Sequence, residues 1–308
     1  MLKKIAITTS SFGQFDPQPL EILEKHGCSF VLNKQGRTLK GEELLTLAQD
    51  CLGVIAGTEQ YNQEILEQLP QLRIISRCGS GMDNLDLNVC DRRGIKIFKT
   101  SDGPQRAVAE LVAGLILNVL RQIHVMDRDI HRGVWQKRMG NLLLGKNVGI
   151  IGLGQVGREV AQLLKALGTN IFYFDPFVSG NIDSHFIRKA NLRGLLQDCD
   201  IISLHVPLTP ETRYLIGEEE LAVMSEHAIL INCSRGGIVD ENALFQALKK
   251  KKLAGAAVDV FEQEPYQGPL CELENIILTP HIGSYAKEAR IKMEIDAVNN
   301  LIVGLTRQ

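Results

Sequence analysis

Three side chains suited to acid–base chemistry and to carboxylate binding follow successive apolar runs in the second half of this 308-residue chain. They are Arg235 in NCSRGG, Glu264 in DVFEQEP and His281 in TPHIG. Histidine has an ordinary pKa of about 6.5, so it can deliver a proton near neutral pH. A neighbouring carboxylate stabilises the imidazolium, and arginine binds a carboxylate or carbonyl in a planar geometry that lysine cannot reproduce. Hydride transfer to a 2-oxo acid requires this set, because the carbonyl oxygen gains negative charge and must be protonated.

The apolar runs before these residues are predicted to be parallel strands. They are Ala228–Asn232, Gly255–Val260 and Asn275–Leu278. Open parallel sheets bind ligands outside the carboxyl ends of their strands, so we expect the three side chains on one ligand-binding edge. Singly, each has a structural alternative: His281 as a structural histidine after a proline, Arg235 as a loop cation, and Glu264 as a solvated turn residue. Their shared position favours the functional interpretation.

The stretch Asn147–Gly168, NVGIIGLGQVGREVAQLLKALG, has the order of strand, glycine turn and helix that a dinucleotide fingerprint requires. Gly152 allows the tight turn, Gly154 lets a pyrophosphate approach the backbone, and Gly157 lets the helix pack on the strand. The helix N-terminus supplies free N–H groups and a partial positive charge for the phosphates. The spacing therefore predicts a dinucleotide site.

The next predicted strand, Asn170–Phe174, leads directly into Asp175. A carboxylate at this distance from the glycines can accept hydrogen bonds from the adenosine ribose hydroxyls, and it repels a 2′-phosphate. Asp175 therefore favours NAD over NADP. The alternative is an ordinary turn residue before Pro176.

Strands and helices alternate in two stretches of the chain, which predicts parallel sheets with helices on both faces. In the first stretch, residues 1 to about 98, the predicted strands are Lys3–Thr8, Ser29–Leu32, Val54–Ala56, Arg73–Ser76 and Lys96–Phe98. Its predicted helices are Leu20–His26, Gly41–Gln49, Gln63–Leu69 and Leu87–Arg93. The second stretch, from Gly145 to about Ile282, adds a strand at Asp200–His205 and a helix at Glu241–Lys252 with Asp240 as its N-cap.

Two long helices are predicted outside these alternating patterns. The first is Gln105–Arg121, continuing with interruptions to about Arg132, and it could be a hinge, a subunit interface or both. The second is Ser284–Leu305, with Ser284 as its N-cap.

A glycine-rich turn follows a predicted strand of the first stretch, in CGSGMDNLD. Three small residues, Gly79–Gly81, can expose backbone N–H groups there, and such a turn can bind an anion such as a carboxylate. An ordinary glycine-rich turn has the same pattern.

Composition bounds the class of protein. The length suggests two domains, and 44% hydrophobic with 23% charged residues is ordinary for a globular protein. A formal net charge of −2 gives nucleic-acid binding no electrostatic support. Seven cysteines without a C-x-x-C pair indicate reduced thiols in a cytoplasmic protein. We expect no signal peptide and no membrane partner, because the apolar runs are too short.

At these residues the sequence resembles the D-isomer-specific 2-hydroxyacid dehydrogenase family over almost its whole length. The resemblance lies in GSGMDNLD, AVAELV, GIIGLGQVG, HVPLTPETR, INCSRGGIVDENAL, AAVDVFEQEP and TPHIGS. RCGSGMDNLD and GTEQYN are most similar to the phosphoglycerate dehydrogenase branch. The resemblance implies an α/β fold of two doubly wound parallel-sheet lobes. A Rossmann NAD-binding lobe, residues 100–284, would be inserted in a flavodoxin-like substrate lobe, residues 1–99 and 285–308.

The resemblance also implies roles for individual residues. Arg235 would anchor the substrate, His281 would be the acid–base group, and Glu264 its carboxylate partner. Asp259 would hold the nicotinamide amide. The other cofactor-contacting positions would be Gly152, Gly154, Gln155, Val156, Gly157, Asp175, His205, Pro207, Thr212, Cys233, Arg235, His281 and Gly283. The substrate would be bound by Arg77, Ser80, Gly81, Arg235 and His281, and no metal site is expected.

The implied activity is that of an NAD-dependent D-2-hydroxyacid dehydrogenase, with 3-phosphoglycerate and 3-phosphohydroxypyruvate as the favoured pair. The implied assembly is a homodimer through the NAD lobe and the helix that contains AVAELV. One departure concerns Gly57, because some phosphoglycerate enzymes carry an arginine near this position that meets the substrate phosphate. Arg77 or Arg106 could meet a phosphate instead. The chain ends soon after its last helix, so serine feedback through a C-terminal regulatory domain is not expected.

Other functions fit the same resemblance. The chain could be a hydroxypyruvate or glyoxylate reductase, or a related dehydrogenase of formate or phosphite. It could also be a non-catalytic NAD-sensing protein, like the transcriptional corepressors of this family. The complete set of Arg235, Glu264 and His281 and the lack of interaction motifs beyond the two lobes favour an enzyme.

Overall fold

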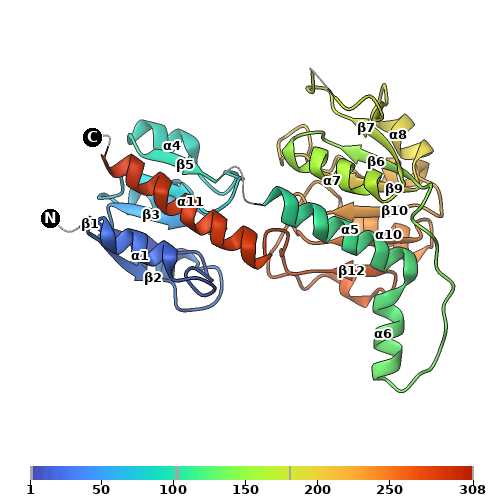
Figure 1. The fold of residues 1–308 in the computed structure, drawn as a ribbon, viewed down its shortest axis with the longest axis horizontal. Helices are drawn as coiled ribbons and strands as arrows, with labels where there is room; N and C mark the ends of the chain where they lie inside the picture. Colours follow the sequence, from blue (N-terminus) through green and yellow to red (C-terminus); the bar gives the residue numbers. More distant parts are fainter. Residues whose placement is uncertain (1–2, 101–103, 180–181, 307–308) are drawn as a thin grey trace. The chain divides into compact units, whose positions relative to one another are not determined.

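The computed structural model describes residues 3–100, 104–179 and 182–306 and divides the chain into two compact units (Figure 1). Unit 1 comprises Met1–Pro104 and Ser284–Gln308, and unit 2 comprises Gln105–Gly283. The last helix therefore belongs with the N-terminal part of the chain. The division falls at 104/105 and 283/284, beside the predicted boundaries at 99/100 and 284/285. Residues 1–2 and 307–308 of the predicted first lobe lie outside the described residues.

Unit 1 is built on a parallel sheet in the order β2-β1-β3-β4-β5. Its strands are β1 Lys3–Ile7, β2 Cys28–Leu32, β3 Gly53–Ala56, β4 Ile74–Arg77 and β5 Lys96–Lys99. One face is covered by α1 Gln18–Lys25 and α11 Lys287–Thr306, and the other by α2 Gly41–Ala48, α3 Gln63–Glu67 and α4 Leu87–Arg92. This is the flavodoxin-like strand order, which confirms the predicted fold of this lobe.

Unit 2 is built on a second parallel sheet, in the order β12-β11-β10-β9-β6-β7-β8. Its strands are β6 Asn147–Ile151, β7 Asn170–Phe174, β8 Ile187–Arg188, β9 Ile201–Leu204, β10 Ile229–Asn232, β11 Gly255–Val258 and β12 Ile276–Leu278. The chain runs outward from β6 to β8 and then from β9 to β12 on the other side. The strand order therefore reverses between β6 and β9, as in a Rossmann fold, and the predicted fold class is confirmed here too.

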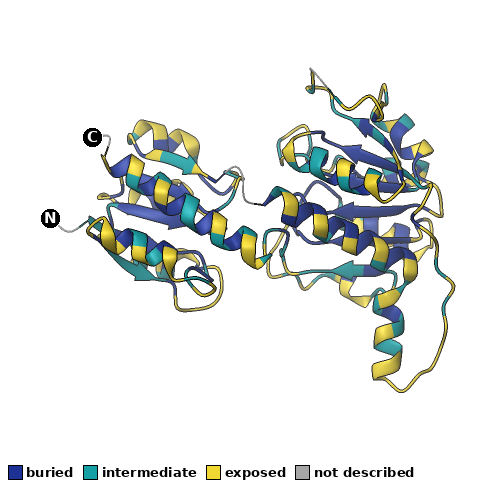
Figure 2. Ribbon diagram, viewed as in Figure 1, coloured by how far each residue is buried: buried dark blue, intermediate teal, exposed yellow. Residues whose placement is uncertain are grey.

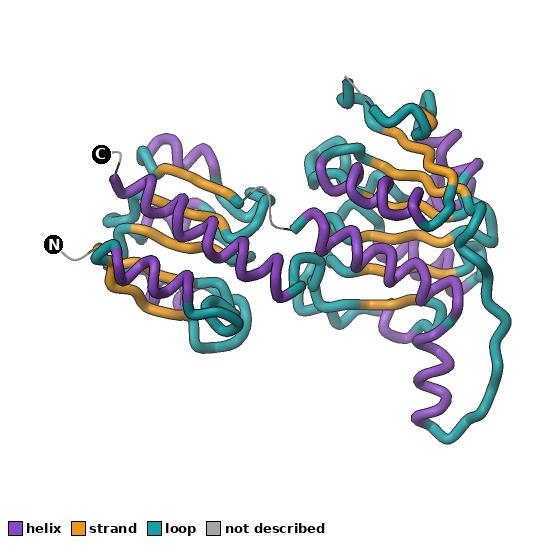
Figure 3. The backbone as a smooth tube through the Cα atoms, in the orientation of Figure 1, coloured by secondary structure: helices purple, strands orange, loops and turns teal. Residues whose placement is uncertain are grey.

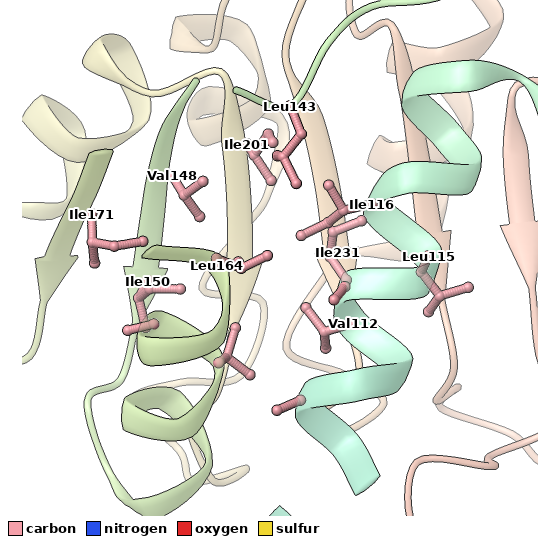
Figure 4. Close-up of a cluster of buried hydrophobic side chains, with 14 of the residues drawn as sticks. Val112, Leu115, Ile116, Leu143, Val148, Ile150, Leu164, Ile171, Ile201 and Ile231 are labelled. Carbon is pink, nitrogen blue, oxygen red and sulfur yellow. The ribbon is translucent and has the colours of Figure 1, made fainter. Parts of the chain in front are cut away.

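Helices bury both faces of the unit 2 sheet (Figures 2 and 3). On one face, α5 Gln105–Arg121 and α7 Gln155–Ala166 lie side by side (Figure 1). Val112, Ile116 and Leu164 of these helices pack with Ile150 and Ile231 of the sheet (Figure 4). The other face is covered by α8 Leu192–Asp198, α9 Glu218–Val223, α10 Glu241–Lys249 and the short 3₁₀ helix Pro269–Glu272. Burial on both faces explains why these strands read as continuous apolar runs.

The strands of unit 2 are in register near their carboxyl ends. One row of paired residues crosses the sheet: Phe174, Ile151, Leu204, Asn232, Val258 and Leu278. The residue after each of these begins a loop on the same edge. In sheet order, these first loop residues are Asp175, Gly152, His205, Cys233, Asp259 and Thr279. The register thus places most of the predicted site residues of unit 2 on one edge.

The predicted continuation of the long helix to about Arg132 is broken by a bend. α5 ends at Arg121, Gln122 has a left-handed φ of 51°, and α6 Ile123–His131 leaves at 67° to α5. In the described part of the chain, no single helix combines the length and apolar character needed to cross a membrane. α5 and α6 meet that test together, as a bent pair, by length and composition only.

Other local features also differ from the sequence predictions. α11 begins at Lys287, so Ser284, the predicted N-cap, lies in a turn three residues upstream and cannot reach the first free N–H groups of the helix. The strand β8 was not predicted, because the two residues of Ile187–Arg188 are too few to show a periodicity.

The helix predicted as Glu241–Lys252 begins as expected and ends earlier. The Asp240 side chain accepts hydrogen bonds from the N–H groups at the start of α10, which confirms it as the N-cap. The helix ends at Lys249 because Lys251 takes a left-handed φ of 55° and its N–H turns back to the Leu248 carbonyl. A lysine here occupies the position that glycine usually takes in such a C-cap.

We predict that the packing of α7 on β6 depends on the missing side chain of Gly157. A Cβ at Gly157 would lie 2.1 Å from the Gly152 carbonyl oxygen, whereas a Cβ at Gly114 of α5 would have no described atom within 4 Å. In thermal unfolding followed by circular dichroism, Gly157→Ala should destabilise the protein by about 1–3 kcal/mol. Gly114→Ala, the matched control, should stabilise it by about 0.5–1 kcal/mol. Similar effects of the two substitutions would contradict the close contact at Gly157.

Candidate active site and dinucleotide site

His281 and Glu264 are brought into direct contact on the carboxyl edge of unit 2. His281 Nδ1 lies 2.9 Å from Glu264 Oε2 and 3.1 Å from Oε1. The two side chains are 35% and 37% exposed, so solvent and a ligand can reach them. Partial burial raises the pKa of Glu264. This effect is outweighed by the hydrogen bond and charge of His281, the Phe261 N–H and the Arg235 charge, so the net pKa is lowered. The carboxylate is thus held ionised beside the imidazole.

Arg235 is positioned by the loop after β10. Asn232, the last residue of that strand, accepts hydrogen bonds from the backbone N–H and the hydroxyl of Ser234, and its amide donates to the Arg235 carbonyl at 3.1 Å. The Arg235 guanidinium donates to the Ser234 carbonyl at 2.7 Å, and its charge acts on Glu264. A Cβ at Gly236 would lie 2.0 Å from the Phe261 carbonyl oxygen, so this loop packs directly on the loop that carries Glu264.

The backbone of His281 is strained. Its φ is 56°, in the left-handed region, which costs a non-glycine residue about 1–2 kcal/mol. Residues held in such conformations concentrate at functional sites. Asp259, fully buried at the end of β11, accepts hydrogen bonds from the residues around His281. Burial raises the pKa of Asp259, while these hydrogen bonds and the His281 charge oppose the rise. Its predicted contact with a nicotinamide amide stays a prediction.

The glycine turn after β6 has the shape of a dinucleotide cradle. Gly152 has a φ of 88°, and a Cβ there would lie 2.5 Å from the His205 carbonyl oxygen. Gly154 is the N-cap of α7, and a Cβ on it would have no described atom within 4 Å. Open backbone at the N-terminus of a twelve-residue helix is what a pyrophosphate requires. The residues present therefore fit a dinucleotide.

Asp175 follows β7 on the same edge. Its Oδ2 accepts the Leu153 N–H of the glycine turn at 2.8 Å, and its Oδ1 accepts the N–H groups of Phe177 and Val178. The carboxylate thus ties the turn to the end of β7. These bonds leave acceptor capacity for ribose hydroxyls, because an ionised carboxylate has about four lone-pair sites.

His205 follows β9 and is held neutral. Burial lowers the pKa of His205 to about 3. Its Nε2 lies 2.8 Å from the buried Ser203 hydroxyl, and its Nδ1 is buried with no hydrogen-bond partner in the described part of the protein. An orphaned polar atom beside the glycine turn is a further feature that a bound group could satisfy.

The other predicted cofactor positions lie in loops or at a helix start on the edge of unit 2. They are Gln155 and Val156 at the start of α7, Pro207 and Thr212 after β9, Cys233 after β10, and Gly283 after β12. Thr212 shapes its own loop by donating to the Pro207 carbonyl at 2.6 Å. Their contacts with a cofactor remain predictions.

In unit 1, the predicted anion-binding residues lie in the turn after β4. Gly79 has a φ of 153°, Ser80 is exposed and Gly81 is half-buried. The turn is therefore accessible, and its binding of a carboxylate stays a prediction.

Arg77, the other predicted substrate-binding residue of unit 1, lies in a buried polar network. It is 7% exposed, and its Nε donates to Asn84 Oδ1 at 3.0 Å. Its charge acts on the buried Glu59, which accepts the Gly57 N–H at 2.7 Å. A Cβ at Gly57 would lie 2.8 Å from Glu59 Oε1, so Glu59 occupies the space that an arginine at position 57 would enter.

Arg106, the second cation considered for a phosphate, lies on α5 of unit 2. It is exposed and forms ion pairs with Glu110 at 2.7 Å and Glu159 at 3.0 Å.

Sequence reasoning missed residues that act behind the site. Asn232 shapes the Arg235 loop, Ser203 holds His205, and Thr279 donates to Asp259. Each lies in or directly after a strand, where an isolated polar residue in an apolar run is the available signal. The network of Glu59 and Arg77 has no comparable signal, because its members are separated along the chain.

Comparison with known proteins places this chain in a family. Residues 113–283 match the family model described as "D-isomer specific 2-hydroxyacid dehydrogenase, NAD binding domain". The match covers more than half of the chain and most of unit 2. The chain belongs to the D-isomer specific 2-hydroxyacid dehydrogenase family, as the sequence motifs predicted, and unit 2 contains the NAD-binding domain.

Individual relatives differ in their names. D-3-phosphoglycerate dehydrogenase of Methanocaldococcus jannaschii is 40% identical over 259 residues, covering 82% of this chain and 49% of that protein. Glyoxylate reductase of Thermococcus litoralis is also 40% identical over 259 residues, covering 80% of this chain and 77% of that protein. The NAD⁺-bound structure of 3-phosphoglycerate dehydrogenase from Entamoeba histolytica has a TM-score of 0.85 and 26% identity, covering 100% of this chain and 96% of that one. The chain spans about half the length of the phosphoglycerate dehydrogenases first among its curated relatives.

We predict that His205 makes folding stability depend on pH. Its pKa is about 3 in the folded protein and about 6.5 in an unfolded chain, so only the unfolded state binds the proton between these values. Stability is therefore lost as pH falls below 6.5, with a slope approaching about 1.4 kcal/mol per pH unit. His205→Phe should remove this slope from urea unfolding curves measured between pH 7 and 5. The exposed His227→Gln is the control, and an unchanged slope in His205→Phe would contradict the buried neutral imidazole.

Proposed function

We propose that this chain is an NAD-dependent D-2-hydroxyacid dehydrogenase, which transfers hydride between NAD(H) and C2 of a 2-oxo or 2-hydroxy acid. The observation that carries the proposal is the His281–Glu264 pair, 2.9 Å apart, on the edge of the sheet that also carries the dinucleotide turn. Proton transfer and hydride transfer must be coupled in this reaction. A histidine–carboxylate pair beside a dinucleotide site supports both.

In this proposal, His281 protonates the carbonyl oxygen during reduction and accepts the hydroxyl proton during oxidation. Glu264 stabilises the imidazolium through its ionised carboxylate. Arg235 binds the substrate carboxylate or carbonyl, for which its planar guanidinium is suited. For unit 1 taken by itself, we propose that the backbone of Ser80 and Gly81 binds an anionic group such as a carboxylate.

Bound NAD supplies the hydride acceptor or donor. The N–H groups at the start of α7 would hold the pyrophosphate beside Gly154, and the Asp175 carboxylate would accept hydrogen bonds from the ribose hydroxyls. A 2′-phosphate would meet the Asp175 carboxylate, so we propose NAD rather than NADP.

For the substrate, we propose 3-phosphoglycerate and 3-phosphohydroxypyruvate as the first pair, because the phosphoglycerate dehydrogenases among the relatives reach 40% identity. Glyoxylate or hydroxypyruvate is the alternative, and it is supported by an equally identical glyoxylate reductase. Glu59 fills the space beside Gly57, and this observation favours the alternative substrates, glyoxylate or hydroxypyruvate.

Purified protein should oxidise NADH with at least one of 3-phosphohydroxypyruvate, hydroxypyruvate, glyoxylate, pyruvate and 2-oxoglutarate, and less well with NADPH. His281→Ala should lower kcat by about 10²- to 10⁴-fold with the best substrate, because the proton donor is lost. NADH binding, measured by fluorescence titration, should be nearly unchanged. Equal turnover in the variant would contradict the role of His281.

The panel also separates the alternatives. Preference for the phosphorylated substrate would support the first pair, and preference for an unphosphorylated acid would support the reductase. Tight NADH binding without turnover of any substrate would favour the non-catalytic NAD-sensing protein.

We also propose a homodimer formed through unit 2, in the cytoplasm. The segment after α6 exposes a set of large apolar side chains: Val134, Trp135, Met139, Leu142 and Leu144. Trp135 is 83% and Met139 is 92% exposed, and this concentration of exposed apolar side chains in one segment supports an interaction surface there. The free thiols of all seven cysteines fit a reducing compartment. The net charge of −2 gives no support to a nucleic-acid partner.

Light scattering should give twice the chain mass of 34.1 kDa for the wild-type protein. The double variant Trp135→Ser, Met139→Ser should shift the protein toward the monomer at low micromolar concentration, because it removes apolar area from the interface. Phe177→Ser, which changes another exposed aromatic residue of unit 2, should leave the dimer intact. A wild-type monomer at high concentration would contradict this assembly.

A further inference from the structure

The loop that carries His281 is bonded to one carboxylate on both sides of the histidine. Asp259 Oδ1 accepts the Thr279 hydroxyl at 2.5 Å and the Ile282 N–H at 2.8 Å. Asp259 Oδ2 accepts the Gly283 N–H at 2.8 Å. Thr279 precedes His281 in the chain, and the other two donors follow it. Asp259 therefore holds the loop on both sides of the histidine, and none of these three bonds involves the Nδ1 atom that faces Glu264.

Thr279 is the only side chain among these three donors, and its backbone is bonded as well. Its N–H donates to the Val258 carbonyl at 3.0 Å, which joins the loop to β11. Its carbonyl accepts the His281 N–H at 3.0 Å. Thr279 therefore contacts both β11, the strand that ends just before Asp259, and His281, whose backbone conformation is left-handed.

We propose that Thr279 is a positioning residue for the acid–base reaction, which it serves by bonding Asp259 and so holding His281 in the left-handed conformation that directs Nδ1 to Glu264. Thr279 acts through Asp259 and takes no part in proton transfer itself. The inference rests on the proposed function, because it assigns Thr279 to the same reaction.

Thr279 could act through its hydroxyl or through its methyl group, and the two roles lead to different expected results. If the methyl group matters through packing, valine should replace threonine well and serine poorly. If the hydroxyl matters through Asp259, the order is reversed, because valine keeps the shape and leaves Asp259 Oδ1 without this donor. The pair Thr279→Val and Thr279→Ser therefore separates the two roles.

The experiment compares wild type, Thr279→Val and Thr279→Ser with the best substrate of the panel. In Thr279→Val, kcat should fall on the order of 10- to 100-fold, because a displaced catalytic group loses its orientation. The NADH dissociation constant should change by a smaller factor than kcat, and Tm should stay close to that of the wild type. Thr279→Ser should restore most of kcat. The ¹⁵N signal of His281 Nδ1, which reports its bond to Glu264, should move in Thr279→Val and return in Thr279→Ser.

Wild-type kcat and an unmoved ¹⁵N signal in Thr279→Val would overturn the inference, as would a serine variant as impaired as the valine variant. If Thr279→Val does not unfold cooperatively, Thr279→Ala replaces it in the comparison with Thr279→Ser. Failure of the proposed function looks different. A wild-type protein without turnover would contradict that function, and the ¹⁵N comparison would still decide whether Thr279 positions His281.

Discussion

The site depends on one constraint, which is that the strands of unit 2 run parallel and end in register. The row from Phe174 to Leu278 fixes where each loop begins. Neighbouring loops then meet at the level of the backbone. A Cβ at Gly152 would strike the His205 carbonyl, and a Cβ at Gly236 would strike the Phe261 carbonyl. A shift of one strand against its neighbour would therefore move the dinucleotide turn, Arg235 and the His281–Glu264 pair away from one another.

Much of this arrangement could be predicted from the sequence because it rests on local signals. Apolar runs bounded by glycine, proline or polar residues marked the strands, and the spacing of Gly152, Gly154 and Gly157 marked the turn. Arg235, Glu264 and His281 each follow such a run, so their shared edge could be predicted without knowing the strand order. The order itself and the return of α11 to unit 1 have no local signal, and here the family resemblance was needed.

The parts that could not be predicted are set by hydrogen bonds between distant segments. His281 and Lys251 take left-handed conformations that local preference disfavours for these residue types. Arg77 stays a predicted substrate-binding residue, and its guanidinium also bonds to Asn84 inside unit 1, where its charge acts on the buried Glu59. Nothing in the charge or spacing of a single arginine indicates such a buried network. The network depends on the burial of its members, and burial follows from the packed fold.

Two carboxylates at the end of β11 show how burial divides their tasks. Asp259 is fully buried, and burial raises its pKa; it remains useful as an acceptor because Thr279, Ile282 and Gly283 all donate to it. Glu264, five residues later, is partly exposed and faces His281, and its net pKa is lowered. A pair of acids whose pKa values are moved in opposite directions by their surroundings is suited to separate roles. Asp259 bonds the loop on both sides of the histidine, while Glu264 bonds its ring and, in the proposed reaction, would stabilise its charge.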